Sequence, residues 1–266
     1  MGTIYKNPAL VELIVELRWE LTPTIMPPGG GLDPFFDVLR ADMAPRLATA
    51  GYPRTQDLVP ANVPRELLAW QPFVRFEPAP DTWPKVQLGP GLFSAHMAGP
   101  QYTGWPDFEP SVREAFDLLL QSFPSYQKLL RLKQVVIRYI NAFTTLHGLE
   151  NYAQFTSRYL GLKSVMPQPF LQSLGVQLGD VSTTSQSKFP IRGLAASHLS
   201  IQAAEGAVNG APACILQLAV EGGNVIKPEH ADLMAWFNGA HDVARQAFTS
   251  LVTPELIQVM QPEEKP

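Results

Sequence analysis

The chain has 266 residues, of which 45% are hydrophobic and 17% are charged, and its formal net charge is −4. It is long enough for two fused units that share one core. The weakly acidic balance argues against duplex nucleic acid as a partner, because proteins that bind a duplex usually present a basic face to the phosphates.

The single cysteine, Cys214, excludes an internal disulfide and a multi-thiolate metal site. The sequence has neither a signal-peptide core nor an apolar stretch of roughly 18 residues, so we expect no membrane association and a cytoplasmic location.

The first predicted element is a long strand over Pro8–Glu20. Apolar and polar residues alternate along it, which is typical of a strand with one face on the core. The polar face carries the carboxylates Glu12, Glu16 and Glu20. A helix follows over residues 35–50, with Asp33-Pro34 at its start.

A hairpin is predicted next, followed by a helix. Residues 73–77 form a short strand, and Lys85–Leu88 and Leu92–Met97 are joined by a Gly-Pro-Gly turn. Asp107–Phe123 has an apolar stripe at helical spacing. Pro124 ends this helix.

A second long strand, Arg131–Phe143, begins the second half of the chain. Apolar residues fall on both of its faces, so we expect a central strand that is covered on both sides. The elements predicted after it are a helix at 150–160, strands at 174–184, 197–203 and 213–221, a long helix at 228–251 and a brief helix capped by Thr253.

The order of these elements predicts an α+β fold made of two pseudo-repeated βαβββα units, an arrangement close to the helix grip. The units are residues 1–127 and 128–261, fused into one globular module, and residues 262–266 form a frayed tail. Each unit would place its helices on one side of an antiparallel sheet. The two opening strands should then lie close together.

Several segments occur in an ordered set along nearly the whole chain: NPALVELIVELRW, VQLGPGLFS, YTGWPDF, IRYIN and AWFNGAHDVARQAFTSLVTPEL. Together they resemble a sporadically distributed bacterial family of uncharacterised proteins of about this length. The resemblance implies one full-length bacterial module, with no activity or cofactor attached to it. A patchy distribution suits an accessory gene beside mobile or defence genes.

Arg138 is the most informative single residue, because it interrupts an apolar strand, where an unpaired charge is strongly penalised. One interpretation is a structural ion pair with Glu12, Glu16 or Glu20 on the first strand. The other is an anion-binding arginine at the base of a pocket. Asn141 lies on the opposite face and is better explained by a backbone hydrogen bond than by a ligand.

His241 and Asp242 are the candidate acid/base pair, on the polar side of the last long helix. Adjacent helical residues point about 100 degrees apart, so a solvated helix face is the simpler interpretation. The other histidines share no metal-ligand spacing. Ser94 lacks the GxSxG context of a hydrolase nucleophile, and no glycine-rich loop has a phosphate-binding spacing. We therefore expect no metal and no cofactor.

Trp70, Trp83 and Trp105 are predicted at loop or strand ends, where tryptophan can line a groove or an interface. Core packing is the default interpretation for about two of the three. With no catalytic motif, the leading hypothesis is a non-catalytic module that binds a protein partner, a second copy or a small ligand. The alternative is a small-molecule enzyme that grips an anionic substrate through Arg138. A third possibility, nucleic-acid binding through Lys128, Arg131 and Lys133, requires steep salt dependence.

Overall fold

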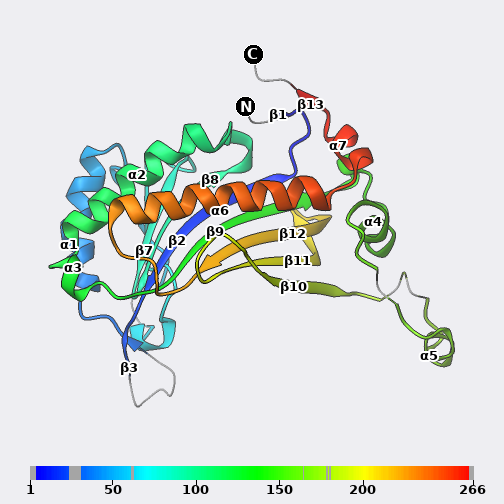
Figure 1. Cartoon of the computed structure of the whole chain (residues 1–266), viewed down its shortest axis with the longest axis horizontal. Helices are drawn as coiled ribbons and strands as arrows, with labels where there is room; N and C mark the ends of the chain where they lie inside the picture. The colour runs from blue at the N-terminus through cyan, green and yellow to red at the C-terminus, as the bar shows by residue number, and fades with distance from the viewer. Residues whose placement is uncertain are drawn as a thin grey trace.

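A nine-stranded antiparallel sheet forms the framework of the computed structural model, with the strand order β10-β11-β12-β9-β2-β8-β7-β6-β5. The structure describes residues 4–23, 31–60, 63–163, 165–177, 179 and 181–263. The sheet is strongly twisted, so that β7 and β10 run in very different directions (Figure 1). Its strands are β2 (Leu10–Trp19), β5 (Arg54–Asp57), β6 (Val74–Glu77), β7 (Lys85–Gly89), β8 (Leu92–Ala98), β9 (Leu132–Phe143), β10 (Thr184–Pro190), β11 (Ser197–Val208) and β12 (Ala211–Gly222).

The two long strands, β2 and β9, lie side by side at the centre of the sheet. Ile14 is opposite Arg138 and Glu16 is opposite Val136, with irregular pairing near each end of β2. The predicted proximity of the two opening strands is therefore confirmed. β2 continues the sheet toward β8, and β9 continues it toward β12.

The turns predicted from glycine and asparagine join neighbouring strands. β7 and β8 pair from Lys85 to Gly89, with Gly91 at a positive φ of 73° in the turn. Asn209 and Gly210 both have positive φ and join β11 to β12, which is the backbone that a tight hairpin turn requires.

One face of the sheet is covered by helices. α1 (Phe36–Thr49), α2 (Trp105–Ser122) and α6 (His230–Leu251) pack on the strand residues Leu13, Val15 and Leu17 and their neighbours in one large core. A second core near β11 and β12 includes residues of α4 (Tyr152–Tyr159) and α7 (Pro254–Met260). In Figure 1 the long α6 runs across this face. We call this the helix face.

The shorter elements complete the chain. They are β1 (Ile4–Tyr5), β3 (Thr22–Pro23), β4 (Gly31–Leu32), η1 (Arg65–Leu68), η2 (Gly99–Gln101), α3 (Tyr126–Leu129), η3 (Thr145–His147), α5 (Gln168–Leu174) and β13 (Pro262–Glu263). β1 pairs with β13, so part of the predicted frayed tail is in a strand, whereas residues 264–266 lie outside the described residues. The predicted boundary at 127/128 lies within α3.

The two edge strands of the sheet differ from what the sequence predicted. The strand expected at 174–184 is wrong, because α5 occupies residues up to Leu174 and Gly175 ends it with a positive φ of 67°. The edge strand begins only at Thr184. The other edge strand, β5, was not predicted; all four of its residues are exposed and polar, so it has no apolar alternation.

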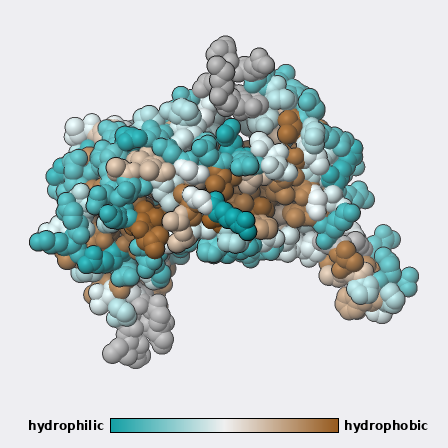
Figure 2. Space-filling view, viewed as in Figure 1, coloured by the Kyte–Doolittle hydropathy of each residue, from teal (hydrophilic) through white to brown (hydrophobic). Residues whose placement is uncertain are grey.

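α5 lies away from the helices that pack on the sheet (Figure 1). Val165, Phe170 and Leu174 in and beside it are more than half exposed, and Figure 2 shows apolar surface at this end of the molecule. Within the described part of the chain, no helix has the length and apolar character needed to span a bilayer.

Candidate functional site

The face opposite the helices carries polar and charged side chains, and we call it the open face. Side chains alternate along a strand, so residues between the core positions of β2 point to this face. The strand pairings extend it across the sheet: Glu16 is opposite Ser94, Ser94 is opposite Gln87, and Gln87 is opposite Arg75. Several of these residues are nevertheless buried, among them Glu16, Ser94 and Gln87. The long side chains of this face therefore pack on one another.

Arg138 lies on the open face of β9, beside the carboxylates that the sequence suggested as its partners. Those carboxylates are engaged elsewhere. Glu16 Oε1 lies 2.5 Å from Arg18 Nε, and Glu12 Oε1 lies 2.7 Å from His96 Nδ1. No ion pair joins Arg138 to another described residue, so the structural ion-pair interpretation gains no support from these contacts.

A compact ionic cluster lies further along the open face. Glu77 Oε2 is 3.2 Å from Lys85 Nζ, and Glu77 Oε1 is 3.1 Å from Arg54 Nε. The Glu77 and Lys85 side chains are only 3% and 6% exposed. A buried charge pair of this kind is costly to break, because the remaining charge would keep only an exposed partner, Arg54 for Glu77 or Asp81 for Lys85.

Arg75 and Arg138 each have one unsatisfied guanidinium nitrogen. The Nε atom of each is buried and has no hydrogen-bond partner. No ion pair or hydrogen bond links either guanidinium to another residue in the part of the chain that the structure describes. Buried donors are normally satisfied, so these two Nε atoms are exceptions that need a physical explanation.

A hydrogen-bonded chain of three side chains connects β8 to β2. Ser94 Oγ lies 2.8 Å from His96 Nε2, and His96 Nδ1 lies 2.7 Å from Glu12 Oε1. The group was not predicted from the sequence, because Glu12 is far from Ser94 and His96 in the chain. The Ser-x-His spacing on a predicted strand was the available signal, since it places both side chains on one face.

Asn141 faces the other side of β9. Its side-chain amide donates to the main-chain oxygen of Leu216 at 3.3 Å, and the residue is buried. This is the backbone hydrogen bond that the sequence favoured for it. Asn141 is thus part of the packing of the helix face.

His241 is half-buried between helix α6 and the sheet, and the prediction of a solvated position is wrong. Its Nδ1 is 2.6 Å from the hydroxyl of Tyr139, and its ring stacks on Trp105. Burial lowers the pKa of His241 and raises that of Tyr139 well above its usual value. Asp242 is exposed and lies 3.6 Å from Arg245, so Tyr139, and not Asp242, orients the imidazole.

The three candidate interface tryptophans occupy different environments. Trp105 is the first residue of α2 and is buried, with its Nε1 donating to Asn238 at 2.7 Å. Trp70 donates to the main-chain oxygen of Trp19 and lies under the ammonium group of Lys133. Trp83 has the ammonium group of Lys85 4.6 Å from its ring centroid. Trp70 and Trp83 remain partly exposed, whereas Trp105 belongs to the core.

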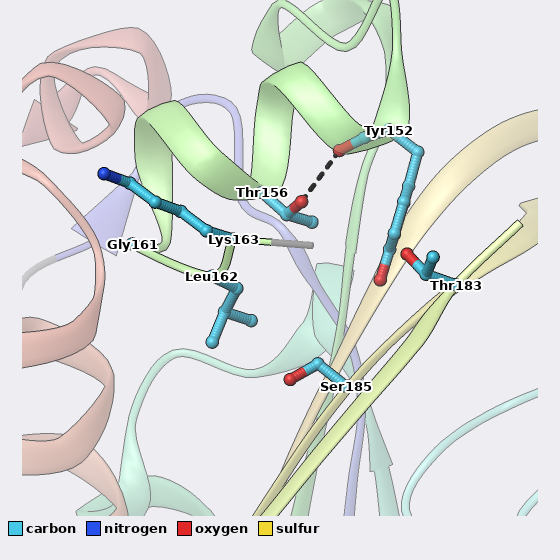
Figure 3. A pocket seen from close by; sticks show the side chains of 7 residues that line it. All are labelled: Tyr152, Thr156, Gly161, Leu162, Lys163, Thr183 and Ser185. Carbon is cyan, nitrogen blue, oxygen red and sulfur yellow. Dashed lines mark hydrogen bonds between the residues drawn. The ribbon is translucent and has the colours of Figure 1, made fainter. Parts of the chain in front are cut away.

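A small pocket lies on the helix face, between α4 and the edge strand β10. Its volume is about 160 Å³, and Figure 3 shows Tyr152, Thr156 and Ser185 around it. Thr156 donates to the main-chain oxygen of Tyr152, and burial raises the pKa of Tyr152 to about 12. Arg138 points to the opposite face of the sheet, so this pocket is separate from the open face.

Within the described ranges, no group of three or more histidine, cysteine, aspartate and glutamate side chains is arranged to hold a metal ion. Comparisons with protein-family models, curated proteins and solved structures gave no match. Among the described residues, the buried side-chain nitrogen and oxygen atoms that lack a hydrogen-bond partner include those of Glu16, Arg18, Arg75, Glu77 and Arg138, all on the open face.

Proposed function

We propose that the chain is a protein-binding module that recognises an acidic partner through its open face. The observation that carries this proposal is the pair of guanidinium groups, Arg75 and Arg138, whose buried Nε atoms have no acceptor. A guanidinium group binds carboxylates and phosphates through parallel hydrogen bonds. An acidic partner would supply the acceptors that this chain does not supply.

The spacing of the two arginines favours a protein over a small ligand. Arg138 is on β9 and Arg75 is on β6, with β2, β8 and β7 between them. Neighbouring strands lie about 4.8 Å apart, so the two positions are separated by roughly 19 Å. An extended peptide covers that distance in about six residues, whereas a small metabolite does not.

The ionic groups near the two arginines give the surface its selectivity. Glu16 and Glu77 are already engaged with Arg18 and Lys85, so they repel an incoming acidic group less than free carboxylates would. They still disfavour a uniformly acidic partner. The preferred partner segment therefore has two acidic groups with neutral residues between them.

Affinity capture from a lysate of the source organism tests this proposal. The wild-type protein should retain a partner at low salt, and the Arg75→Met/Arg138→Met variant should lose it. Arg245→Met is the matched control, because Arg245 is exposed on α6, away from the open face. Retention of the same partner by the double variant would contradict the proposal.

The alternative function is a small-molecule enzyme in which Arg138 grips an anionic substrate. It is favoured by the hydrogen-bonded chain of Ser94, His96 and Glu12 on the same face. An Arg138→Met variant that kept full activity toward an anionic substrate would exclude Arg138 from that role.

The pseudo-repeat and the biological setting belong to the same proposal. The strand order β9-β12-β11-β10 in the second half resembles β2-β8-β7-β6 in the first, since in each half the opening strand pairs with the last strand of a meander. Superposition of the two halves, residues 1–127 and 128–261, would test the repeat.

The family resemblance implies a cytoplasmic accessory role beside mobile or defence genes. The identity of the neighbouring genes would test this role.

A further inference from the structure

The strongest unexplained feature outside the arginine pair is the chain of contacts from Ser94 to His96 and Glu12. The ladder between β2 and β8 places Glu12 diagonally across from His96, because Ile14 is opposite His96 and Glu12 is opposite Ala98. Ser94 and His96 are 2% and 7% exposed. The three groups are therefore held in a fixed geometry by two central strands.

The hydrogen bonds determine which nitrogen of His96 carries the proton. The Glu12 carboxylate can only accept, so His96 Nδ1 donates its N–H to Glu12 Oε1 over 2.7 Å. In the neutral imidazole, Nε2 then has a free lone pair that accepts the Ser94 hydroxyl over 2.8 Å. Serine as donor to histidine, and histidine as donor to the carboxylate, are the hydrogen-bonding roles in a serine-histidine-acid nucleophilic group.

A donor for a developing negative charge lies beside Ser94. Gln87 is directly opposite Ser94 in the ladder and is 8% exposed. Its side-chain amide offers two N–H donors and forms no hydrogen bond with another described residue. Arg75, opposite Gln87 on the next strand, adds a positive charge. Such donors stabilise an oxyanion when they are aimed at it before the reaction.

We infer that Ser94, His96 and Glu12 form a nucleophilic site that takes an acyl group from an ester. Ser94 Oγ attacks the carbonyl carbon while its proton passes to His96 Nε2, and the Gln87 amide donates to the carbonyl oxygen as it becomes negative. The C–O bond to the leaving alcohol then breaks, and that alcohol leaves with the proton from His96. Water releases the acyl group from Ser94 by the same route. Glu12 acts as a positioning residue.

The open face explains how a substrate reaches a buried hydroxyl. The neighbours of Ser94 in the ladder are the side chains of Glu16 and Gln87, and the large helices pack on the other face. Glu16 and Gln87 are themselves buried, so both side chains must move before a reagent reaches the Ser94 hydroxyl. We therefore expect access through side-chain movement, and slow reaction with a bulky reagent.

A neutral fluorophosphonate tests this inference separately from the arginine proposal, because the reagent has no negative charge for Arg75 or Arg138 to bind. Mass spectrometry should find one covalent adduct, on the peptide that contains Ser94, in which the serine oxygen has displaced fluoride. Ser94→Ala should abolish the adduct. His96→Gln should slow its formation by about 100-fold or more, which is the usual size of a general-base contribution.

The matched control is Ser200, which lies on the open face of β11 two residues from His198. Ser200 is buried to a similar degree, but no hydrogen bond to that histidine is present. Ser200→Ala should therefore label like the wild type. Glu12→Gln should slow labelling by about tenfold or more without unfolding the protein, and Glu12→Asp should recover part of the rate.

Hydrolysis of p-nitrophenyl acetate is the second measurement, because this ester is smaller than the labelling reagent. The wild-type protein should release nitrophenolate faster than folded Ser94→Ala. Equal labelling and equal hydrolysis by the wild type and Ser94→Ala would overturn the inference. Absence of both reactions in the wild type would overturn it as well, whatever the outcome of the partner-capture experiment.

Discussion

The helix face and the open face are built from the same strands, yet they hold the protein together in different ways. Consecutive residues of β8 show the difference. Phe93 is fully buried on the helix face against Phe116, whereas Ser94 is buried on the open face in a hydrogen bond with His96. One face gains stability from apolar area removed from water, and the other from ion pairs and hydrogen bonds between its side chains. A buried residue is therefore not by itself a core residue in this sheet.

The largest expected effect is at Phe93. Phe93→Ala should lower the free energy of unfolding by about 4 kcal/mol, because it leaves a cavity beside Phe116. Ser94→Ala, the adjacent position on the opposite face, should lower it by about 1 kcal/mol, the usual net value of one hydrogen bond. Urea unfolding of both variants measures the difference. Equal losses would show that the two faces do not differ in the way described.

The next effect is at the buried ion pair of the open face. Glu77→Gln should lower the free energy of unfolding by about 3 kcal/mol, because it leaves the ammonium group of Lys85 with little compensation. Glu255→Gln removes an exposed carboxylate that pairs with Arg158, and it should cause no measurable change. If both variants unfold at the wild-type urea concentration, the open face is an ordinary solvated surface.

A smaller effect concerns acid stability and the histidines of the helix face. Burial lowers the pKa values of His147 and His241 from the usual 6.5. Thr144 N–H also donates to His147 Nδ1, which must be unprotonated to accept it. The folded-state pKa of each histidine is below its unfolded-state value. The two neutral histidines therefore make their full contribution to the free energy of unfolding above about pH 6.5, and this contribution is lost as pH falls through the folded-state pKa.

The thermal unfolding midpoint should accordingly decrease between pH 7 and pH 5. Replacing His147 or His241 by glutamine should make that decrease smaller, since glutamine does not titrate. Calorimetry at a series of pH values checks this. An unchanged decrease in both variants would mean that other groups cause the acid sensitivity.

The smallest expected effect on stability is at Arg138. Arg138→Met should change the free energy of unfolding by no more than about 0.5 kcal/mol, because the guanidinium forms no ion pair with another described residue. The variant should nevertheless lose partner binding. A large loss of stability would show instead that Arg138 is structural, and urea unfolding distinguishes the two outcomes.

The sequence was sufficient for the elements with strong patterns. Alternation along Pro8–Glu20 and the apolar run of Arg131–Phe143 predicted the two central strands, and the structure confirms that they are neighbours. The Asn209-Gly210 turn and the last long helix were also found. The polar edge strands β5 and β10 were not, because an edge strand without an apolar face has no period that distinguishes it from a loop.

The candidate site was only partly predictable. The sequence suggested Glu12 and Glu16 as neighbours of Arg138, and the pairing of β2 with β9 places Ile14, which lies between them, opposite Arg138. Their actual partners, His96 and Arg18, depend on the pairing between β2 and β8. That register is set by contacts across the sheet, and a one-residue shift would move every side chain to the other face. The burial of His241 likewise depends on where Trp105 packs.

Nuclear magnetic resonance of the arginine Nε–H groups tests the binding surface most directly. The probe is a peptide with two glutamates six positions apart and neutral residues between them, titrated into the isotope-labelled protein at low salt. We expect the signals of Arg75 and Arg138 to shift together at the same peptide concentration, while the signal of Arg245 stays in place. Shifts at Arg245 alone, or no shift at Arg75 and Arg138, would contradict the assignment of the open face as the binding surface.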